Sequence, residues 1–328
     1  MTARLFFVLV APAYFLLSCE EPSSPKGTVQ LPLSDPVSAP VAATPPVTPT
    51  MTPTVWSEVK LHEVIRAKNP GYSGNGQFQI DGAGQVQAVA LDNCGVTDLS
   101  PFRGMSLMAL YLQSCAVPDI SPLKGMPLVE LYLENTAVKD LSPLAGMSEL
   151  RKLYLSGAMV TDLSPLKGLG IVELNLVSTK VSDLSPLAGM PLQMLWLTDT
   201  PVSDISALAK SPLVSLTLHR TAVSDLSPLA GTSLQRLHIG ETPVTDLSPL
   251  KGLPLTRLVL NPNMIQKGFE YIEQMSSLTE IGTKFEDGGN DLQPLGAFLQ
   301  ARAAAKPGDA PGDAPGDAPA EKTAKVVP

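Results

Sequence analysis

Few residues in this 328-residue chain are of the types that carry out chemistry. The imidazoles and thiols are limited to His62, His219, His238, Cys19, Cys94 and Cys115. Their spacing does not resemble a zinc site, and the chain contains no nucleophile-elbow, His-Glu-x-x-His or phosphate-loop pattern. We therefore expect no catalytic residue, no metal and no cofactor, and we predict that the chain is not an enzyme.

One acidic residue recurs at a regular interval and raises the question of calcium binding. The aspartates stand 21 residues apart, with a single interval of 22, at Asp98, Asp119, Asp140, Asp162, Asp183, Asp204, Asp225 and Asp246. The glycine-rich nonapeptide of calcium-binding repeats is absent. Each carboxylate can instead accept backbone N–H groups in its own turn, so we interpret this column as structural.

The apolar residues between these aspartates keep the same interval. The pattern L-x-x-L-x-L first appears as Val86-x-x-Val89-x-Leu91 and recurs eight times, giving nine expected strands. Alternation places both final leucines in the core and the residue between them outside. The Ser-Pro that follows predicts a short helical turn capped by Ser, which Gly then ends in a left-handed conformation. One such copy cannot bury its apolar side alone, so the copies must stack.

The repeat Val96-Thr97-Asp98-Leu99-Ser100-Pro101 and its later copies resemble the leucine-rich repeats of internalin-type bacterial surface proteins. The resemblance covers about 57–285. It implies an α/β solenoid: a leucine-rich-repeat horseshoe of about nine 21-residue repeats, with a parallel concave sheet, short helical or 3₁₀ convex turns and helical caps. Where that family usually has Asn or Cys after the strand, this chain has Thr at five positions, which predicts a weaker ladder of backbone bonds. These are Thr136, Thr179, Thr200, Thr221 and Thr242.

The repeats span residues 86–263. The segments on either side of them are predicted to form caps. At residues 55–85 we expect an amino-terminal cap, with a helix over 57–68 and a strand over 77–81 that pairs back onto the first repeat. Residues 264–305 should form a helical carboxy-terminal cap, in which Ile265, Phe269 and Ile272 give one apolar face and 291–305 gives a second helix. A solenoid needs such caps because its end repeats would otherwise expose their core.

The amino terminus predicts export and a lipid anchor. Arg4 precedes an apolar run over 5–17, which is shorter than the roughly 20 residues that span a bilayer. The run ends at Leu16-Leu17-Ser18-Cys19, which resembles a lipobox, so residues 1–18 are expected to be a signal peptide and Cys19 to be lipidated. Residues 19–54, rich in proline, are expected to be a disordered tether, and 306–328 a disordered Pro-Gly-Asp-Ala tail. We predict a cell-envelope protein, periplasmic or at the cell surface.

The outward row of the concave sheet is the candidate binding site. Four of its nine residues are aromatic, although only 5% of the chain is: Tyr111, Tyr132, Tyr154 and Trp196. Tyr and Trp commonly anchor interfaces, but they also shield strands. Acidic residues flank the row in its amino-terminal half (Asp92, Glu130, Glu134, Glu173), with Lys152 interrupting them. Basic residues and histidines flank it in the other half (His219, Arg220, Arg236, His238, Arg257), with Glu241 interrupting them. A face with acidic residues at one end and basic residues at the other can orient a partner, or it can simply be a solvated surface of mixed charge.

The sequence is compatible with three hypotheses of function. The first is a tethered module that captures a protein or peptide, the second a structural spacer of the envelope, and the third a glycan-binding surface. A net charge of −8 argues against nucleic acid as the partner, and a monomer is expected. Cys94 and Cys115 occupy equivalent positions in adjacent copies, so they form either a disulfide or two small buried side chains.

Overall fold

The computed structural model describes residues 54–284 and 291–304. The predicted signal peptide, the lipidation site Cys19, almost all of the predicted tether and the predicted carboxy-terminal tail lie outside the described residues. Among the residues that are described, no helix has the length and apolar character needed to cross a membrane.

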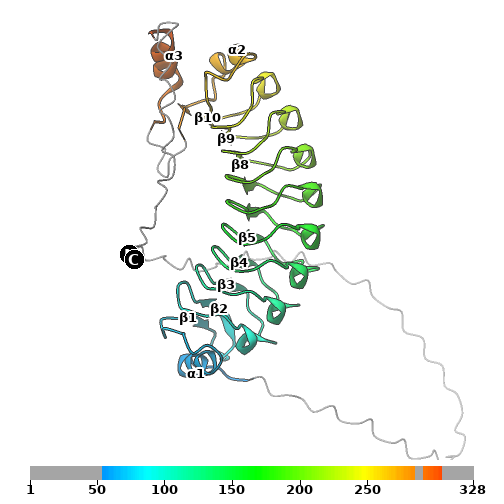
Figure 1. Cartoon of the computed structure of the whole chain (residues 1–328), viewed down its shortest axis with the longest axis vertical. Helices are drawn as coiled ribbons and strands as arrows, with labels where there is room; N and C mark the ends of the chain where they lie inside the picture. Colours follow the sequence, from blue (N-terminus) through cyan, green and yellow to red (C-terminus); the bar gives the residue numbers. More distant parts are fainter. Residues whose placement is uncertain (1–53, 285–290, 305–328) are drawn as a thin grey trace, which may run out of the picture. The chain divides into compact units, whose positions relative to one another are not determined.

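The described residues form one eleven-stranded sheet whose spatial order follows the sequence (Figure 1). The first two strands pair as an antiparallel hairpin, and every later strand is parallel to the one before it. The strands are β1 (Gln77–Ile80), β2 (Val86–Ala90), β3 (Ala109–Tyr111), β4 (Glu130–Tyr132), β5 (Lys152–Tyr154), β6 (Glu173–Asn175), β7 (Met194–Trp196), β8 (Ser215–Thr217), β9 (Arg236–His238), β10 (Arg257–Val259) and β11 (Glu280–Gly282). The predicted leucine-rich-repeat solenoid is confirmed.

One strand was missed. The nine predicted repeat strands are β2 to β10, and β11 lies within residues 264–305, which were predicted to form a helical cap. Its residues Leu278 and Ile281 keep the first two apolar positions of the repeat and are buried. Gly282 and Thr283 then replace the outward residue and the final leucine, so the pattern broke off before it could be recognised.

The first eight repeats each turn through one 3₁₀ helix of three residues, as predicted, whereas the ninth, which begins with β10, is followed by an α-helix. The 3₁₀ helices are η1 (Ser100–Phe102), η2 (Ser121–Leu123), η3 (Ser142–Leu144), η4 (Ser164–Leu166), η5 (Ser185–Leu187), η6 (Ser206–Leu208), η7 (Ser227–Leu229) and η8 (Ser248–Leu250). Figure 1 shows them along the side of the stack opposite the strands. In seven of the eight, the Gly shortly after the helix has a positive φ, as expected from its freedom to adopt left-handed backbone.

The prediction that Ser caps each turn is wrong, because Ser is the first residue of the 3₁₀ helix and the residue before it makes no side-chain cap bond. The repeated aspartate caps the turn instead. In all eight repeats its Oδ1 accepts the backbone N–H of Ser at 2.7–2.8 Å. These N–H donors hold the pKa of Asp140 and of Asp225 below its ordinary value. The structural interpretation of the aspartate column is confirmed.

The threonine column also bonds the backbone, as predicted. Each buried Thr donates its hydroxyl to the carbonyl oxygen three residues earlier, for example Thr136 to Leu133 at 2.7 Å. The residue before each of the five threonines has a left-handed backbone although none of these residues is glycine, as at Asn135 and Arg220. Each repeat therefore bends sharply directly after its strand.

The two cysteines of the first repeats occupy this same position, and the disulfide considered between them is not formed. Cys94 and Cys115 are free and buried. The Cys94 thiol donates to the carbonyl of Asp92 at 3.4 Å, and the Cys115 thiol to that of Leu91 at 3.0 Å. Both thiols contact backbone oxygens, as the threonine hydroxyls do in later repeats.

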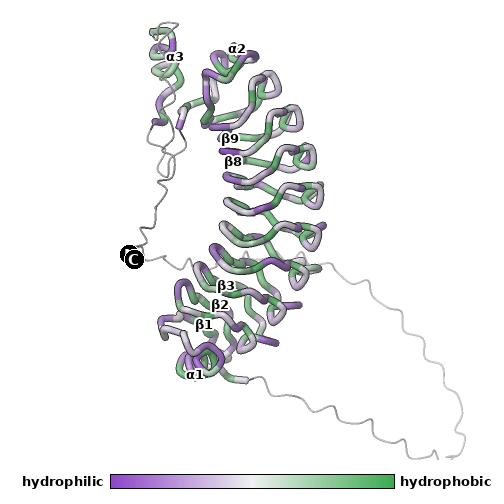
Figure 2. Tube along the Cα trace, in the orientation of Figure 1, coloured by the Kyte–Doolittle hydropathy of each residue, from purple (hydrophilic) through white to green (hydrophobic). Residues whose placement is uncertain are grey.

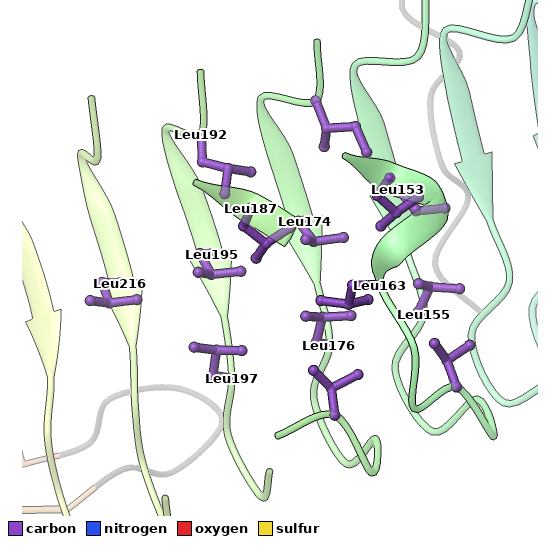
Figure 3. Close-up of a cluster of buried hydrophobic side chains, with 14 of the residues drawn as sticks. Leu153, Leu155, Leu163, Leu174, Leu176, Leu187, Leu192, Leu195, Leu197 and Leu216 are labelled. Atoms are coloured by element: carbon purple, nitrogen blue, oxygen red, sulfur yellow. The ribbon is translucent and has the colours of Figure 1, made fainter. Parts of the chain in front are cut away.

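The core is a ladder of inward leucines. Leu153, Leu174, Leu195 and Leu216 lie in register on four neighbouring strands, and Figure 3 shows them side by side. They are at most 1% exposed. Figure 2 shows hydrophobic positions recurring at the same place in successive repeats. Neighbouring repeats bury one another's leucines. The sheet face that points away from the core is therefore not needed to form the core.

Both ends of the ladder are covered. α1 (Glu58–Lys68) is capped by Ser57 and buries Leu61 and Ile65. Next to it, buried Asn69 accepts the backbone N–H groups of Thr97 and Asp98. α2 (Phe269–Glu273) and α3 (Leu295–Ala304) lie at the other end.

The second closing helix begins later than predicted. The prediction begins it at residue 291, but the helix begins at Leu295. Asp291 Oδ2 instead accepts the N–H groups of Thr283 and Lys284. Gln293 forms a bridge with Ile281 that occupies the outer edge of β11.

Candidate binding face

The predicted outward residues lie on one surface of the sheet, which we call the outer face. It consists of the strand residues that alternate with the buried leucines, and each strand contributes one residue before its inward leucine and one after it. On β4, Glu130 and Tyr132 are partly exposed and Leu131 between them is buried. β5 to β7 repeat this arrangement, so parallel pairing aligns the outward residues in rows across the sheet.

The aromatic residues stack on one another. Tyr111, Tyr132 and Tyr154 are in register on three adjacent strands. The ring centroids of Tyr111 and Tyr132 are 4.8 Å apart, and those of Tyr132 and Tyr154 are 4.3 Å apart and nearly parallel, at 6°. Tyr132 therefore has a neighbouring ring on both sides, one tilted by 44° and one stacked against it, and such aromatic pairs stabilise one another beyond the area they bury.

Trp196 extends the row across a gap. The strand between β5 and β7 carries Asn175, whose Oδ1 accepts the backbone N–H of Val177 and the hydroxyl of Ser156, both at 3.0 Å. Its side chain is thus held by neighbouring groups in its own and the preceding repeat. The rings of Tyr154 and Trp196, on the strands that flank Asn175, have their centroids 5.9 Å apart. We call the four rings Tyr111, Tyr132, Tyr154 and Trp196 the aromatic row.

A charged network holds the hydroxyls of Tyr111 and Tyr154. Tyr111 donates to Glu130 Oε2 and Tyr154 donates to Glu173 Oε2, each at 2.8 Å. Lys152 lies on the strand between the two carboxylates, with its Nζ 3.3 Å from Glu130 and 3.8 Å from Glu173. Burial lowers the pKa of Lys152, but Glu130 and Glu173 together outweigh burial and raise it. The carboxylates predicted to bind a partner are thus already paired within the chain.

Burial and the carboxylate partner also affect the tyrosines. Burial raises the pKa of Tyr154 well above its ordinary value, and the bond to Glu173 adds to this effect. Burial likewise raises the pKa of Tyr132. Both phenols stay protonated at neutral pH, so they serve as hydrogen-bond donors and not as nucleophiles or bases.

The carboxy-terminal half of the outer face is different. Arg236 is exposed on β9, and the next strand places Arg257 in register with it. Arg257 donates from Nε and Nη2 to Glu280 Oε2 at 2.7 and 2.6 Å. Glu280 lies on β11, which the repeat pattern does not predict, so the pattern does not predict this partner of Arg257 either.

The two predicted site histidines are not presented as free cations. His219 is 2% exposed, and burial lowers its pKa. Burial, together with the nearby charges of Arg257, His219 and Arg236, lowers the pKa of His238 to about 4. Both rings are therefore neutral at pH 7. Arg220, counted on the basic side, pairs through Nη2 with Asp199 Oδ2 at 2.6 Å.

The structure thus brings together some of the predicted site residues and separates others. The aromatic row, Glu130 and Glu173 form one connected group. Glu134 lies just past β4 and is partly buried, and Asp92 binds the backbone N–H of Gln113 at 2.8 Å. Lys152, which appeared in the sequence as an interruption of the acidic side, is the centre of the connected group. The predicted charge gradient is reduced accordingly.

The described residues contain no group of three or more His, Cys, Asp or Glu side chains that could hold a metal ion.

Comparison with known proteins gives structural neighbours. No family model and no curated protein matches the chain. The internalin InlF of Listeria monocytogenes is 26% identical with a TM-score of 0.57, over 70% of this chain and 69% of its own. Internalin C2 of the same species is also 26% identical, with a TM-score of 0.52, over 63% of this chain and 94% of its own. The chain therefore has the leucine-rich-repeat fold of internalins, as the repeats implied.

Proposed function

We propose that this chain is a non-enzymatic binding module that captures a protein or peptide partner on the outer face of its sheet. Lipid on Cys19 holds the module at a membrane of the cell envelope, and residues 19–54 give it reach. The fold supports a binding role, because stacked repeats offer a long continuous surface and the internalin likeness supports an exported or surface-exposed protein.

The aromatic row is the observation that carries the proposal. Four large rings lie side by side on a surface that the core does not need. Glu130 and Glu173 hold the hydroxyls of Tyr111 and Tyr154, and Lys152 pairs with both carboxylates. These two rings therefore have little side-chain entropy left to lose on binding. Rigid aromatic side chains with few rotamers are the groups that dominate protein interfaces.

The stacking geometry favours a protein over a glycan. Sugars bind aromatic residues by lying against an open ring face. Tyr132 has the rings of Tyr111 and Tyr154 on its two sides, so the middle of the row offers its ring edges to a ligand. Edges suit the side chains of a protein, which can approach an aromatic ring edge-on.

A crosslinking capture from envelope extract tests the proposal. The bait is the chain itself, run beside a Tyr132→Ala/Trp196→Ala double variant that removes two rings from the row. We expect the parent to capture a protein that the variant loses. The matched control is Val59→Ala/Met159→Ala, which removes two exposed apolar side chains away from the aromatic row and should leave capture unchanged.

The alternative of a structural spacer gives the opposite result. If the spacer reading is right, the aromatic variant supports normal cellular function while deletion of whole repeats does not. Equal capture by the parent and by the folded Tyr132→Ala/Trp196→Ala variant would contradict binding at the aromatic row. Competition by soluble cell-wall fragments would instead indicate a glycan.

A further inference from the structure

The two halves of the outer face differ in how their charges are satisfied. In the aromatic half, Glu130 and Glu173 each bind a tyrosine hydroxyl and share Lys152. A basic side chain of a partner would therefore have to compete with groups of the chain itself. This half offers its rings, and its two central carboxylates are already compensated.

Arg236 is in the opposite situation. It is exposed on β9, and within residues 54–284 and 291–304 no carboxylate lies at ion-pair distance from it. Its in-register neighbours are Ser215 on β8 and Arg257 on β10, so a hydroxyl stands on one side and a second guanidinium on the other. A guanidinium offers several N–H donors in one plane, an arrangement that matches a carboxylate.

The distance between the two features is short. Trp196 ends the aromatic row on β7. Arg236 lies two strands further on and in the other outward row, because it is in register with Met194 and not with Trp196. Two strand spacings and a two-residue offset along the strand together give about 12 Å. An extended peptide that runs diagonally across the strands covers this distance in about three to four residues. One short segment can therefore contact both.

We infer that the partner binds through an extended segment that places an apolar side chain against Trp196 and, about three residues away, an aspartate or glutamate against Arg236. This inference rests on the proposed function and adds the chemistry and the orientation of the partner. Arg257 contributes positive potential beside the contact, although Glu280 already binds it. The segment runs across the strands with its acidic end over β9 and β10.

A pair of fluorescent peptides tests the inference directly. Both carry one leucine in a Gly-Ser background, and three residues further on one has glutamate and the other glutamine. For the parent chain we expect the glutamate peptide to bind about fivefold more tightly, the size of one exposed ion pair. Higher salt should reduce this advantage.

Three variants locate the effect. Arg236→Gln should abolish the advantage of the glutamate peptide, and Arg236→Lys should keep part of it. Lys167→Gln is the matched control, because it removes the same charge from an exposed residue at the end of η4. The inference is overturned if both peptides bind the parent equally, if neither binds, or if Arg236→Gln keeps the full preference.

The chain's own acidic residues are the competing occupant. Asp309, Asp313 and Asp317 recur in the Pro-Gly-Asp-Ala repeats, outside the described residues. If their substitution by asparagine increases the affinity for the glutamate peptide, they compete for Arg236 and the assignment to a partner is wrong. Unchanged affinity supports the assignment.

The extract experiment separates the two proposals. Capture that is lost with Tyr132→Ala/Trp196→Ala but kept with Arg236→Glu overturns the acidic contact and leaves the proposed function standing. Loss with both variants supports both proposals.

Discussion

The aromatic half of the outer face and the half that follows it share one backbone and differ in chemistry. From β3 to β7 the outward residues stack and pair with one another, through rings and through Glu130, Lys152 and Glu173. From β8 to β10 the positions in register with the aromatic row are Thr217, His238 and Val259, of which Thr217 and Val259 are buried, and Arg236 is exposed in the other outward row.

This difference shows what a repeat fold leaves free. The inward leucines and backbone pairing are the same in both halves, so neither can explain why one half is aromatic and the other basic. The outward side chains take no part in the strand pairing, which uses backbone N–H and C=O groups. Outward side chains can therefore change along the outer face with little loss of stability. A binding function can for this reason be located there.

The largest expected effect is an acid sensitivity confined to the carboxy-terminal half. The pKa of His238 is about 4 in the folded chain, against about 6.5 in an unfolded one. Between these values the unfolded chain binds the proton more readily. Stability is therefore fully present above pH 6.5 and falls as the pH drops toward 4, by up to about 3 kcal/mol.

Urea denaturation across this pH range, compared with a His238→Gln variant, measures the effect. The variant should lose much of the dependence, with the remainder due partly to His219. Hydrogen exchange should place the acid-induced opening in β8 to β10, because no histidine lies between β3 and β7. Opening that begins in the aromatic half would contradict the assignment.

The next effect tests the internal pairing of the aromatic half. Lys152→Met should leave Glu130 and Glu173 partly buried without their shared cation and destabilise the chain by about 1–2 kcal/mol. Adding Glu173→Gln should recover part of the loss, because it removes one of the two uncompensated charges. Thermal denaturation of the single and double variants checks this. If Lys152→Met melts like the parent, the network is only a surface ion pair.

The comparison also shows which parts of the chain could be predicted from sequence. The inward leucines, the aspartate column and the threonine bonds were predictable because each repeats and each has a single local cause. Glu280 was not, because β11 keeps only Leu278 and Ile281 of the pattern and then has Gly282. The serine cap was misassigned because Ser and Asp can both satisfy the same turn, and the sequence does not rank them.

The aromatic row was predictable as a set of residues but not as a geometry. The repeat register places Tyr111, Tyr132 and Tyr154 on adjacent strands. The rings of Tyr154 and Trp196 lie 5.9 Å apart, although the strand between theirs carries Asn175, whose Oδ1 accepts two hydrogen bonds, one of them from Ser156 in the preceding repeat. Such contacts between repeats vary along the stack, and a consensus pattern does not contain them.

The smallest expected effect comes from substituting two equivalent aspartates, one in each half, in the turns on the side opposite the strands. The two halves are alike there. Asp140 and Asp225 each accept the N–H and the hydroxyl of the following Ser, with distances of 2.7–2.8 Å. The N–H donors lower the pKa of both carboxyls, so the stability they contribute is present near neutral pH and is lost as the pH falls through the lowered values. Asp140→Ala and Asp225→Ala should each lower the melting temperature at pH 7 slightly and by the same amount, with a smaller loss near pH 3. Unequal losses would mean that the two halves differ in their turns as well as on the outer face, and the contrast between the halves could then no longer be attributed to outward side chains alone.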